Sequence, residues 1–287
     1  FSTGGAVIKG CAISGWQIAS LRSGIAALTL LILFRETRRG WCGRTWLVGC
    51  TYAATMILFV LGNKLTTAAN TIFLQGTAPL YVLALAPFFL GEKPQRREVL
   101  VMPLLALGMA LFFIGAQQPL ATAPDPFRGN FAGAGAGLSY GLTLVGLRWL
   151  QRGNGSAITA VTLGNLLAAA ISLPFGWPLT DAATYDWLAV IYLGAIQIGL
   201  AYVFLTAGVR RLSALEVSLL LLAEPVLSPI WAFIFHGERP GPWALAGAAP
   251  PSGRHRRRPP AGCRGPRRGA AGSRPSRSPG QGASGPG

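Results

Sequence analysis

The segment that decides the fold runs from Lys64 to Pro94 and reads KLTTAANTIFLQGTAPLYVLALAPFFLGEKP. A second copy of its pattern runs from Arg210 to Pro240 and reads RRLSALEVSLLLLAEPVLSPIWAFIFHGERP. In both copies a proline interrupts a long apolar run, which ends in Gly-Glu, a basic residue and a second proline. A duplicated membrane hairpin of this kind is typical of transporters, in which two related halves move around a shared central site.

The rest of the chain is also apolar, with 51% hydrophobic and only 12% charged residues. Apolar stretches of about 20 residues, which can cross a bilayer as helices, recur throughout. We expect spans at 12–34, 46–63, 67–90, 98–116, 129–149, 157–177, 187–209 and 214–236, with partial spans at 1–10 and 243–249. The sequence therefore predicts an all-α polytopic membrane protein.

Basic residues alternate between the connections that join these spans. Four connections contain most of them: Arg35, Arg38, Arg39, Arg44, Lys93, Arg96, Arg97, Arg148, Arg152, Arg210 and Arg211. The intervening connections contain only Lys64, Arg128 and Arg239. The positive-inside rule therefore predicts that the first set faces the cytoplasm, and we expect a bacterial inner membrane. Because an odd number of spans separates equivalent positions, the two halves are expected to be an inverted repeat.

On its motifs the chain resembles the EamA-type members of the drug/metabolite transporter superfamily, which have two five-helix repeats. The motifs are the two hairpin ends, the run LLLLAEPV at 219–226 and Leu138-Ser-Tyr-Gly141. The resemblance implies ten transmembrane helices, with a first repeat at 1–116 and a second at 117–249. Here the first helix is expected to be partial and the tenth to be lost. The resemblance also implies export of amino acids or related small metabolites by alternating access.

Residues 250–287 differ from the rest of the chain in composition. They hold nine arginines and no acidic residue, and without them the net charge falls from +16 to +7. Such an Arg/Gly/Pro-rich segment buries too little apolar surface to fold, so we expect disorder. One interpretation is a genuine tail that contacts anionic lipid headgroups. The other, which we favour, is the product of a reading-frame slip in a GC-rich gene. We expect no nucleic-acid partner.

Two ionisable residues are expected at membrane depth, where charges are expensive. Glu224 precedes Pro225 near the middle of its span, where a carboxylate can exchange a proton or pair with a cationic substrate. The alternative is a protonated carboxyl group hydrogen-bonded to a neighbouring helix. The first copy has Ala78 at the equivalent position. Arg22 either offers its charge to a substrate carboxylate or extends to the membrane interface.

Uncharged polar and aromatic residues form a second set of candidates for the cavity wall: Trp16, Asn70, Gln75, Tyr81, Tyr140, Asn165, Gln197 and Tyr202. For each of them, a hydrogen bond between helices is the alternative. Pro79 and Pro225 are expected to kink their helices and to free a carbonyl group beside the cavity. Glycines recur every fourth residue at Gly129, Gly133, Gly137 and Gly141. This spacing predicts a helix face suited to close packing.

The sequence lacks the phosphate-binding GxxxxGK[ST] and metalloprotease HExxH motifs, so we expect no enzyme activity and no catalytic residue. Its cysteines form no CxxC pair, and we expect no metal and no cofactor. The expected partners are a small-molecule metabolite, the lipid bilayer and protons as coupling ion. The sequence also allows a homodimer. Two alternatives remain, namely a non-functional truncated transporter and, less favoured, a membrane-embedded lipid-modifying enzyme.

Overall fold

The described residues of the computed structural model are 3–92, 99–100, 102–103, 106–107, 110, 123–153, 155–179, 182–221 and 224, and all lie in the unit that ends at Pro251. Before residue 93 the elements are α1 (Gly4–Gly10), α2 (Gly15–Leu33), the 3₁₀-helix η1 (Arg35–Arg38), α3 (Gly43–Leu65), α4 (Ala68–Gln75) and α5 (Ala78–Leu90). After residue 122 they are α7 (Pro126–Arg152), α8 (Ala157–Gly176), α9 (Thr184–Ile191), the π-helix η2 (Tyr192–Leu200), α10 (Ala201–Val209) and α11 (Ala214–Leu220).

Five segments in this part of the chain are long and apolar enough to cross a membrane: Gly15–Leu33, Gly43–Leu65, Ala68–Leu90, Ala157–Gly176 and Thr184–Arg211. They correspond to five of the predicted spans and confirm a helical, multi-pass membrane protein. The predicted span 98–116 lies mostly outside the described residues. Only residues 214–221 and 224 of the predicted span 214–236 are described.

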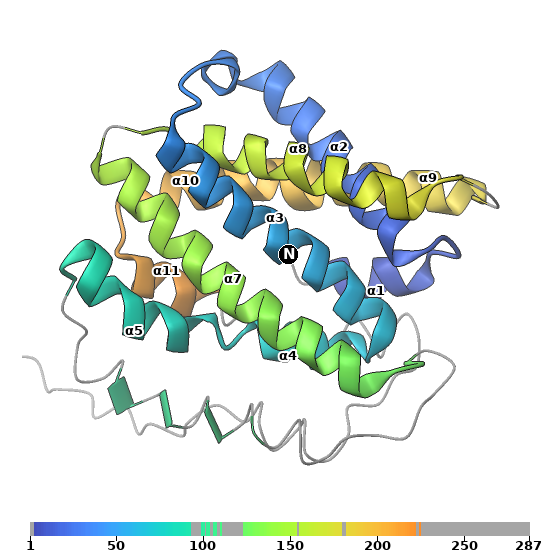
Figure 1. Cartoon of the computed structure of the whole chain (residues 1–287), viewed down its shortest axis with the longest axis horizontal. Coiled ribbons are helices and arrows are strands. Elements are labelled where there is room, and N and C mark those ends of the chain that lie inside the picture. Colours follow the sequence, from blue (N-terminus) through green and yellow to red (C-terminus); the bar gives the residue numbers. More distant parts are fainter. Residues whose placement is uncertain are drawn as a thin grey trace, which may run out of the picture. The chain divides into compact units, whose positions relative to one another are not determined.

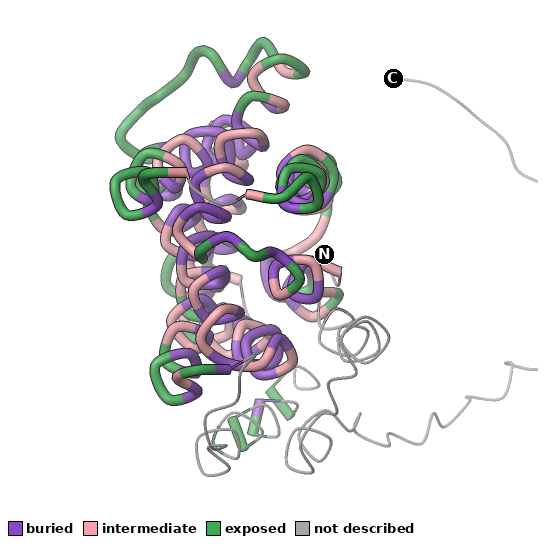
Figure 2. Tube along the Cα trace, turned by 90° about the vertical axis from the view of Figure 1, so that its right-hand side faces the viewer, coloured by how far each residue is buried: buried purple, intermediate pink, exposed green. Residues whose placement is uncertain are grey.

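Helix α7 covers the predicted span 129–149, but its composition does not place it among these five segments. The reason is its many glycines, which give little hydropathy but allow close packing. It lies alongside α3 (Figure 1) and also packs against α4 and α5. Buried and exposed residues alternate along single helices (Figure 2), so each helix has a packed side and an open side.

The duplicated hairpins begin in the same way. The Thr67 hydroxyl accepts a hydrogen bond from Asn70 N at 3.2 Å, at the start of α4. At the equivalent place before α11, the Ser213 hydroxyl accepts one from Glu216 N at 3.2 Å. A hydroxyl at this position satisfies a backbone N–H that has no partner within the helix. The matching Thr-Ala and Ser-Ala pairs in the sequence are therefore matching helix caps.

The predicted span 67–90 is divided into two helices by a short turn at Gly76 and Thr77, which we call the break. Helix α4 ends at Gln75, and α5 begins at Ala78 with Pro79 in its first turn. Proline lacks an N–H group, which is harmless in a first turn but would interrupt a continuous helix. The Thr77 hydroxyl donates to the Leu74 carbonyl oxygen at 2.6 Å and so satisfies one of the last acceptors of α4.

The helix ends form two groups. At one end, which we call the basic end, Arg44 lies 4.7 Å from the Trp149 ring centroid, and the Thr159 hydroxyl donates to the Glu36 carbonyl oxygen. The contacts of the opposite end are Lys64 Nζ to Cys11 O at 2.7 Å, Ala12 N to Asp186 Oδ1 at 2.8 Å and Asp125 N to Leu65 O at 3.0 Å. The connections rich in arginine therefore lie together, and those poor in arginine lie together at the other end.

Candidate functional site

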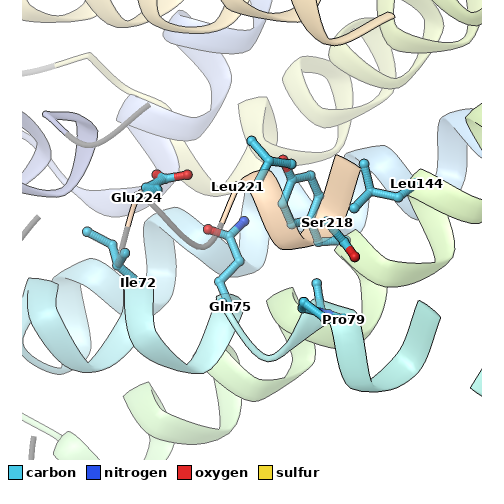
Figure 3. A pocket seen from close by; sticks show the side chains of 10 residues that line it. Ile72, Gln75, Pro79, Leu144, Ser218, Leu221 and Glu224 are labelled. Carbon is cyan, nitrogen blue, oxygen red and sulfur yellow. The ribbon is translucent and has the colours of Figure 1, made fainter. Parts of the chain in front are cut away.

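Two adjoining cavities lie between helices of the two halves. The first is lined by Ile72, Gln75, Gly76, Ala78, Pro79, Tyr140, Leu144, Ser218, Leu221 and Glu224 (Figure 3). The second is lined by Arg22, Met56, Phe59, Gln75, Tyr140, Gln197, Ile198, Tyr202 and Glu224. Gln75, Tyr140 and Glu224 line both cavities, so the two adjoin at these three residues.

The duplicated hairpins contribute equivalent positions to the first cavity. Alignment of the two copies pairs Ile72 with Ser218, Gln75 with Leu221 and Ala78 with Glu224, and all six residues line it. Each pair has one polar and one apolar member. The cavity therefore lies where the two copies of the repeat face each other, with different chemistry on each side.

The break between α4 and α5 positions Gln75. Its side chain extends from the end of α4 into the space beside Leu221 and Glu224 (Figure 3). A continuous helix would carry its backbone hydrogen bonds through this point, whereas the break leaves the segment around Gly76 beside the cavity. Irregular backbone at membrane depth is tolerated where it lines a cavity.

Arg22 is a buried cation without a counter-charge in the described part of the chain. Its side chain is 1% exposed, and its Nη2 donates to the Met56 carbonyl oxygen at 2.9 Å. The guanidinium carbon lies 5.7 Å from the Phe59 ring centroid. Among the described residues Nε has no hydrogen-bond partner and no carboxylate pairs with the group. Since a guanidinium stays charged, the cavity wall holds a positive charge that forms no ion pair with these residues.

Glu224 lies in the same region, at the wall of both cavities. Its backbone N–H donates to the Leu221 carbonyl oxygen at 3.0 Å, which continues the turn beyond α11. The described residues provide no hydrogen bond or ion pair to its carboxyl group, so the predicted alternative of a bond to a neighbouring helix finds no partner there. Glu224 and Arg22 thus face one cavity without pairing with each other.

Gln197 and Tyr202 line the second cavity from one predicted span, 187–209, whose middle is a π-helix. A π-helical stretch is rare and is frequent at functional sites. Within it Gly194 permits close contact with α2, since a Cβ there would lie 2.6 Å from the Arg22 carbonyl oxygen. Tyr202 packs edge-on against Tyr52, with ring centroids 4.8 Å apart.

Four other predicted wall residues are not among those that line the two cavities. Asn165 donates to the Tyr52 hydroxyl at 3.0 Å, so it supports the wall from behind. Trp16 stacks against Phe175 at 4.8 Å between ring centroids. The other two face α7: Tyr81 packs against Gly141, and Asn70 donates to Asn130 Oδ1 at 3.3 Å. Pro225 lies outside the described residues.

The four glycines of α7 face α4, α5 and the connection before α4. A Cβ at Gly129 would lie 2.6 Å from Thr66 N, and one at Gly133 would lie 3.2 Å from Leu74 Cβ. A Cβ at Gly137 would lie 2.6 Å from the Leu74 carbonyl oxygen. The corresponding distance at Gly141 is 2.9 Å, to Tyr81 Cβ. This face brings α7 close to the break that exposes Gln75.

Sequence reasoning missed several residues of the site. Met56 contributes its backbone carbonyl group, which every residue has and which therefore gives no sequence signal. Phe59 does not differ in type from the other apolar residues of its span. Ser218 could have been found, because the repeat aligns it with Ile72 about two turns before the prolines. The sequence also contains the hydrolase motif GxSxG, at Gly137-Leu-Ser-Tyr-Gly141. That pattern lies inside the continuous helix α7 rather than on a strand-to-helix turn, so it forms no nucleophile elbow.

Comparisons with known proteins agree with this architecture. A family model described as "EamA-like transporter family" matches residues 1–114 and 127–250. An uncharacterized protein of Pseudomonas aeruginosa is 31% identical over 247 residues, which cover 81% of this chain and 80% of that protein. An uncharacterized transporter of Archaeoglobus fulgidus is 25% identical over 185 residues, 64% of each chain. One crystal structure, 19% identical, has a TM-score of 0.64 over 84% of this chain and 86% of its own, which shows a shared fold.

Proposed function

The chain belongs to the EamA-like transporter family, and we propose that it is a secondary active transporter of a bacterial inner membrane that exports amino acids or related small metabolites. In this proposal residues 1–116 and 117–249 are inverted repeats, the basic end faces the cytoplasm, and protons are the coupling ion. One observation supports it most: Arg22 and Glu224 line the same cavity, and neither has a partner of opposite charge among the described residues.

Arg22 is suited to bind a substrate carboxylate. A buried guanidinium that is not paired with a carboxylate is unfavourable, so an anion that enters the cavity and pairs with it removes part of that cost. The free Nε donor can then complete a hydrogen bond that the described residues do not supply. Arginine binds carboxylates through paired N–H donors, which fixes the orientation of the ligand.

Glu224 is suited to bind a substrate ammonium group or a proton, but not both at once. Binding of the cation requires the ionised carboxylate, and protonation releases it. Exchange of substrate for proton at one carboxylate couples the movement of the two in opposite directions. A zwitterion with one charge for each residue matches the cavity better than a neutral or singly charged solute.

The equivalent pairs of the first cavity support alternating access. Because each hairpin contributes the same three positions, the cavity lies at the centre of the repeat relationship. A rocking movement of one half against the other therefore changes access on both sides while the binding residues stay central.

Counterflow in proteoliposomes tests the proposal with a panel of amino acids and related metabolites. We expect Arg22→Gln to weaken substrate exchange at least about tenfold, because one charge-assisted contact is lost. Glu224→Gln should retain some exchange but lose accumulation driven by an imposed pH gradient. Arg35→Gln and Glu36→Gln, at exposed positions of η1, are matched controls. Accumulation that persists in Glu224→Gln would sink the coupling role, and exchange of no panel member would favour the non-functional alternative.

A further inference from the structure

A cluster of charges at the basic end joins the two halves of the chain. Glu92, in the Gly-Glu-Lys-Pro end of the first hairpin, follows α5 directly. Its Oε1 accepts hydrogen bonds from Arg148 Nε at 3.2 Å and from Arg152 Nη2 at 2.7 Å, both on α7. Its Oε2 accepts one from Ala214 N, the first residue of α11, at 3.2 Å. We call Glu92, Arg148, Arg152 and the Ala214 N–H the Glu92 clamp.

The arginines extend the clamp to further helix ends. Arg148 Nη1 donates to the Val209 carbonyl oxygen at 2.6 Å, at the end of α10. Arg152 Nη1 donates to the Leu90 carbonyl oxygen, at the end of α5. One carboxylate from the first half thus connects the ends of α5, α7, α10 and α11. Only 15% of the Glu92 side chain is exposed, so the contacts are not those of a fully solvated surface pair.

Buried apolar residues lie between the cavity and the clamp in the described part of the chain. Along α7, Arg148 follows Tyr140 by about 12 Å at the rise of an α-helix. Buried apolar residues pack in the interval and around the clamp: Ala86, Leu90, Leu144, Leu147, Val209 and Leu215. These six side chains offer no polar group to a solute between the cavity and the basic end.

We propose that the Glu92 clamp is the latch that closes the central cavity toward the basic end, and that its release opens the cavity there. The inference rests on the proposed transport function. Three observations support it. The clamp contacts join helix ends of opposite halves, buried apolar residues lie between them and the cavity, and two arginines share one carboxylate. Loss of that carboxylate leaves two like charges and an unpaired backbone N–H, which drives these helix ends apart.

Thiol accessibility tests the latch without any substrate. In a chain whose four cysteines are replaced by serine, Ser218→Cys places a single thiol at the cavity wall. A membrane-impermeant thiol reagent is added to inside-out vesicles, which expose the basic end if it is cytoplasmic, and to right-side-out vesicles as the reverse. We expect Glu92→Gln to increase the labelling rate from the basic end about tenfold, the shift that loss of charge-assisted hydrogen bonds produces. Glu36→Gln, the same charge change at an exposed position of the same end, should leave the rate unchanged.

A charge-reversed pair separates the latch from a merely structural role. Glu92→Arg combined with Arg148→Glu restores one carboxylate–arginine pair and should return the labelling rate toward that of the parent. If Glu92→Gln does not give a monodisperse protein, Arg152→Gln removes the more exposed contact and should still raise the rate. An unchanged rate from the basic end in the folded variants would overturn the proposal. A chain that labels as expected but transports no metabolite would contradict the proposed function and leave the latch standing.

Discussion

Close packing of α7 against the broken hairpin can be tested with one methyl group. Gly137→Ala places a Cβ 2.6 Å from the Leu74 carbonyl oxygen and 3.0 Å from Thr77 Oγ1. Ordinary contact begins at 3.4 Å, so α7 and the end of α4 would have to separate by about 0.8 Å. The closest atom belongs to the backbone and cannot rotate away. The strain therefore falls on the segment that holds Gln75.

The matched control lies on the same helix. A Cβ at Gly135 meets only Leu58 Cδ1, at 3.2 Å, and that flexible side chain can shift. Both alanines gain the same helix propensity, about 1 kcal/mol over glycine. Gly137→Ala should lose about 1–3 kcal/mol to overpacking relative to Gly135→Ala. For a chain of this size the difference corresponds to a Tm lower by roughly 2–6 °C.

Thermal unfolding of the purified variants in detergent measures this difference, and counterflow measures its effect on the site. We expect Gly135→Ala to match or exceed the parent in Tm and to exchange substrate normally. Gly137→Ala should unfold at lower temperature and exchange substrate more weakly, because the break beside Gln75 is displaced. Equal Tm values for the two alanine variants would refute the reasoning that this glycine face is required for packing.

Three further predictions concern single side chains. Arg22→Met should raise the Tm or leave it unchanged while abolishing exchange, because an unbalanced buried charge is removed, and a clear fall in Tm would contradict this. In single-cysteine variants Cys11 should react with maleimide much more slowly than Cys42 at pH 7. Burial raises the pKa of the Cys11 thiol to about 11. A hydrogen bond with the Thr45 hydroxyl lowers the pKa of the exposed Cys42 thiol. Between pH 7 and 9 the Cys11 rate should rise about tenfold per unit and the Cys42 rate should rise less, and parallel pH profiles would contradict this. Asp186→Ala should lower the free energy of unfolding by about 2–4 kcal/mol, because the Asp186 carboxylate accepts two backbone N–H bonds. Asp186→Asn should lower it by less, because the amide keeps one acceptor. Equal Tm values for the two variants would count against this.

The repeat made much of the architecture predictable. Matching caps at Thr67 and Ser213, the proline in each hairpin and the alternation of basic connections are local signals, and each depends on few neighbours. The break before Pro79 lies where the sequence predicts a kink. Proline lacks the N–H group of a continuous helix, and the Leu74 carbonyl oxygen accepts from both the backbone and the side chain of Thr77 at this turn.

Other features of the site depend on tertiary contacts that no residue pattern encodes. The π-helix η2 is flanked by residues with α-helical backbone angles, such as Ile191 at φ −64° and ψ −47°, so the backbone on either side does not mark where it begins or ends. Trp16 and Asn165 are as suitable for a cavity wall as Gln197 by residue type. Trp16 packs against Phe175 and Asn165 donates to Tyr52, and these partners come from segments that are distant in the sequence.

The duplicated hairpins share geometry but divide the chemistry between them. At the cavity the carboxylate belongs to the second copy, Glu224, while the first copy has Ala78. At the basic end the clamp carboxylate belongs to the first copy, Glu92. On the proposals above, binding and latching therefore reside in different hairpins, and the two should respond separately. Glu92→Gln should change which side of the membrane reaches the cavity without weakening the site itself, whereas Glu224→Gln should change the site without releasing the clamp.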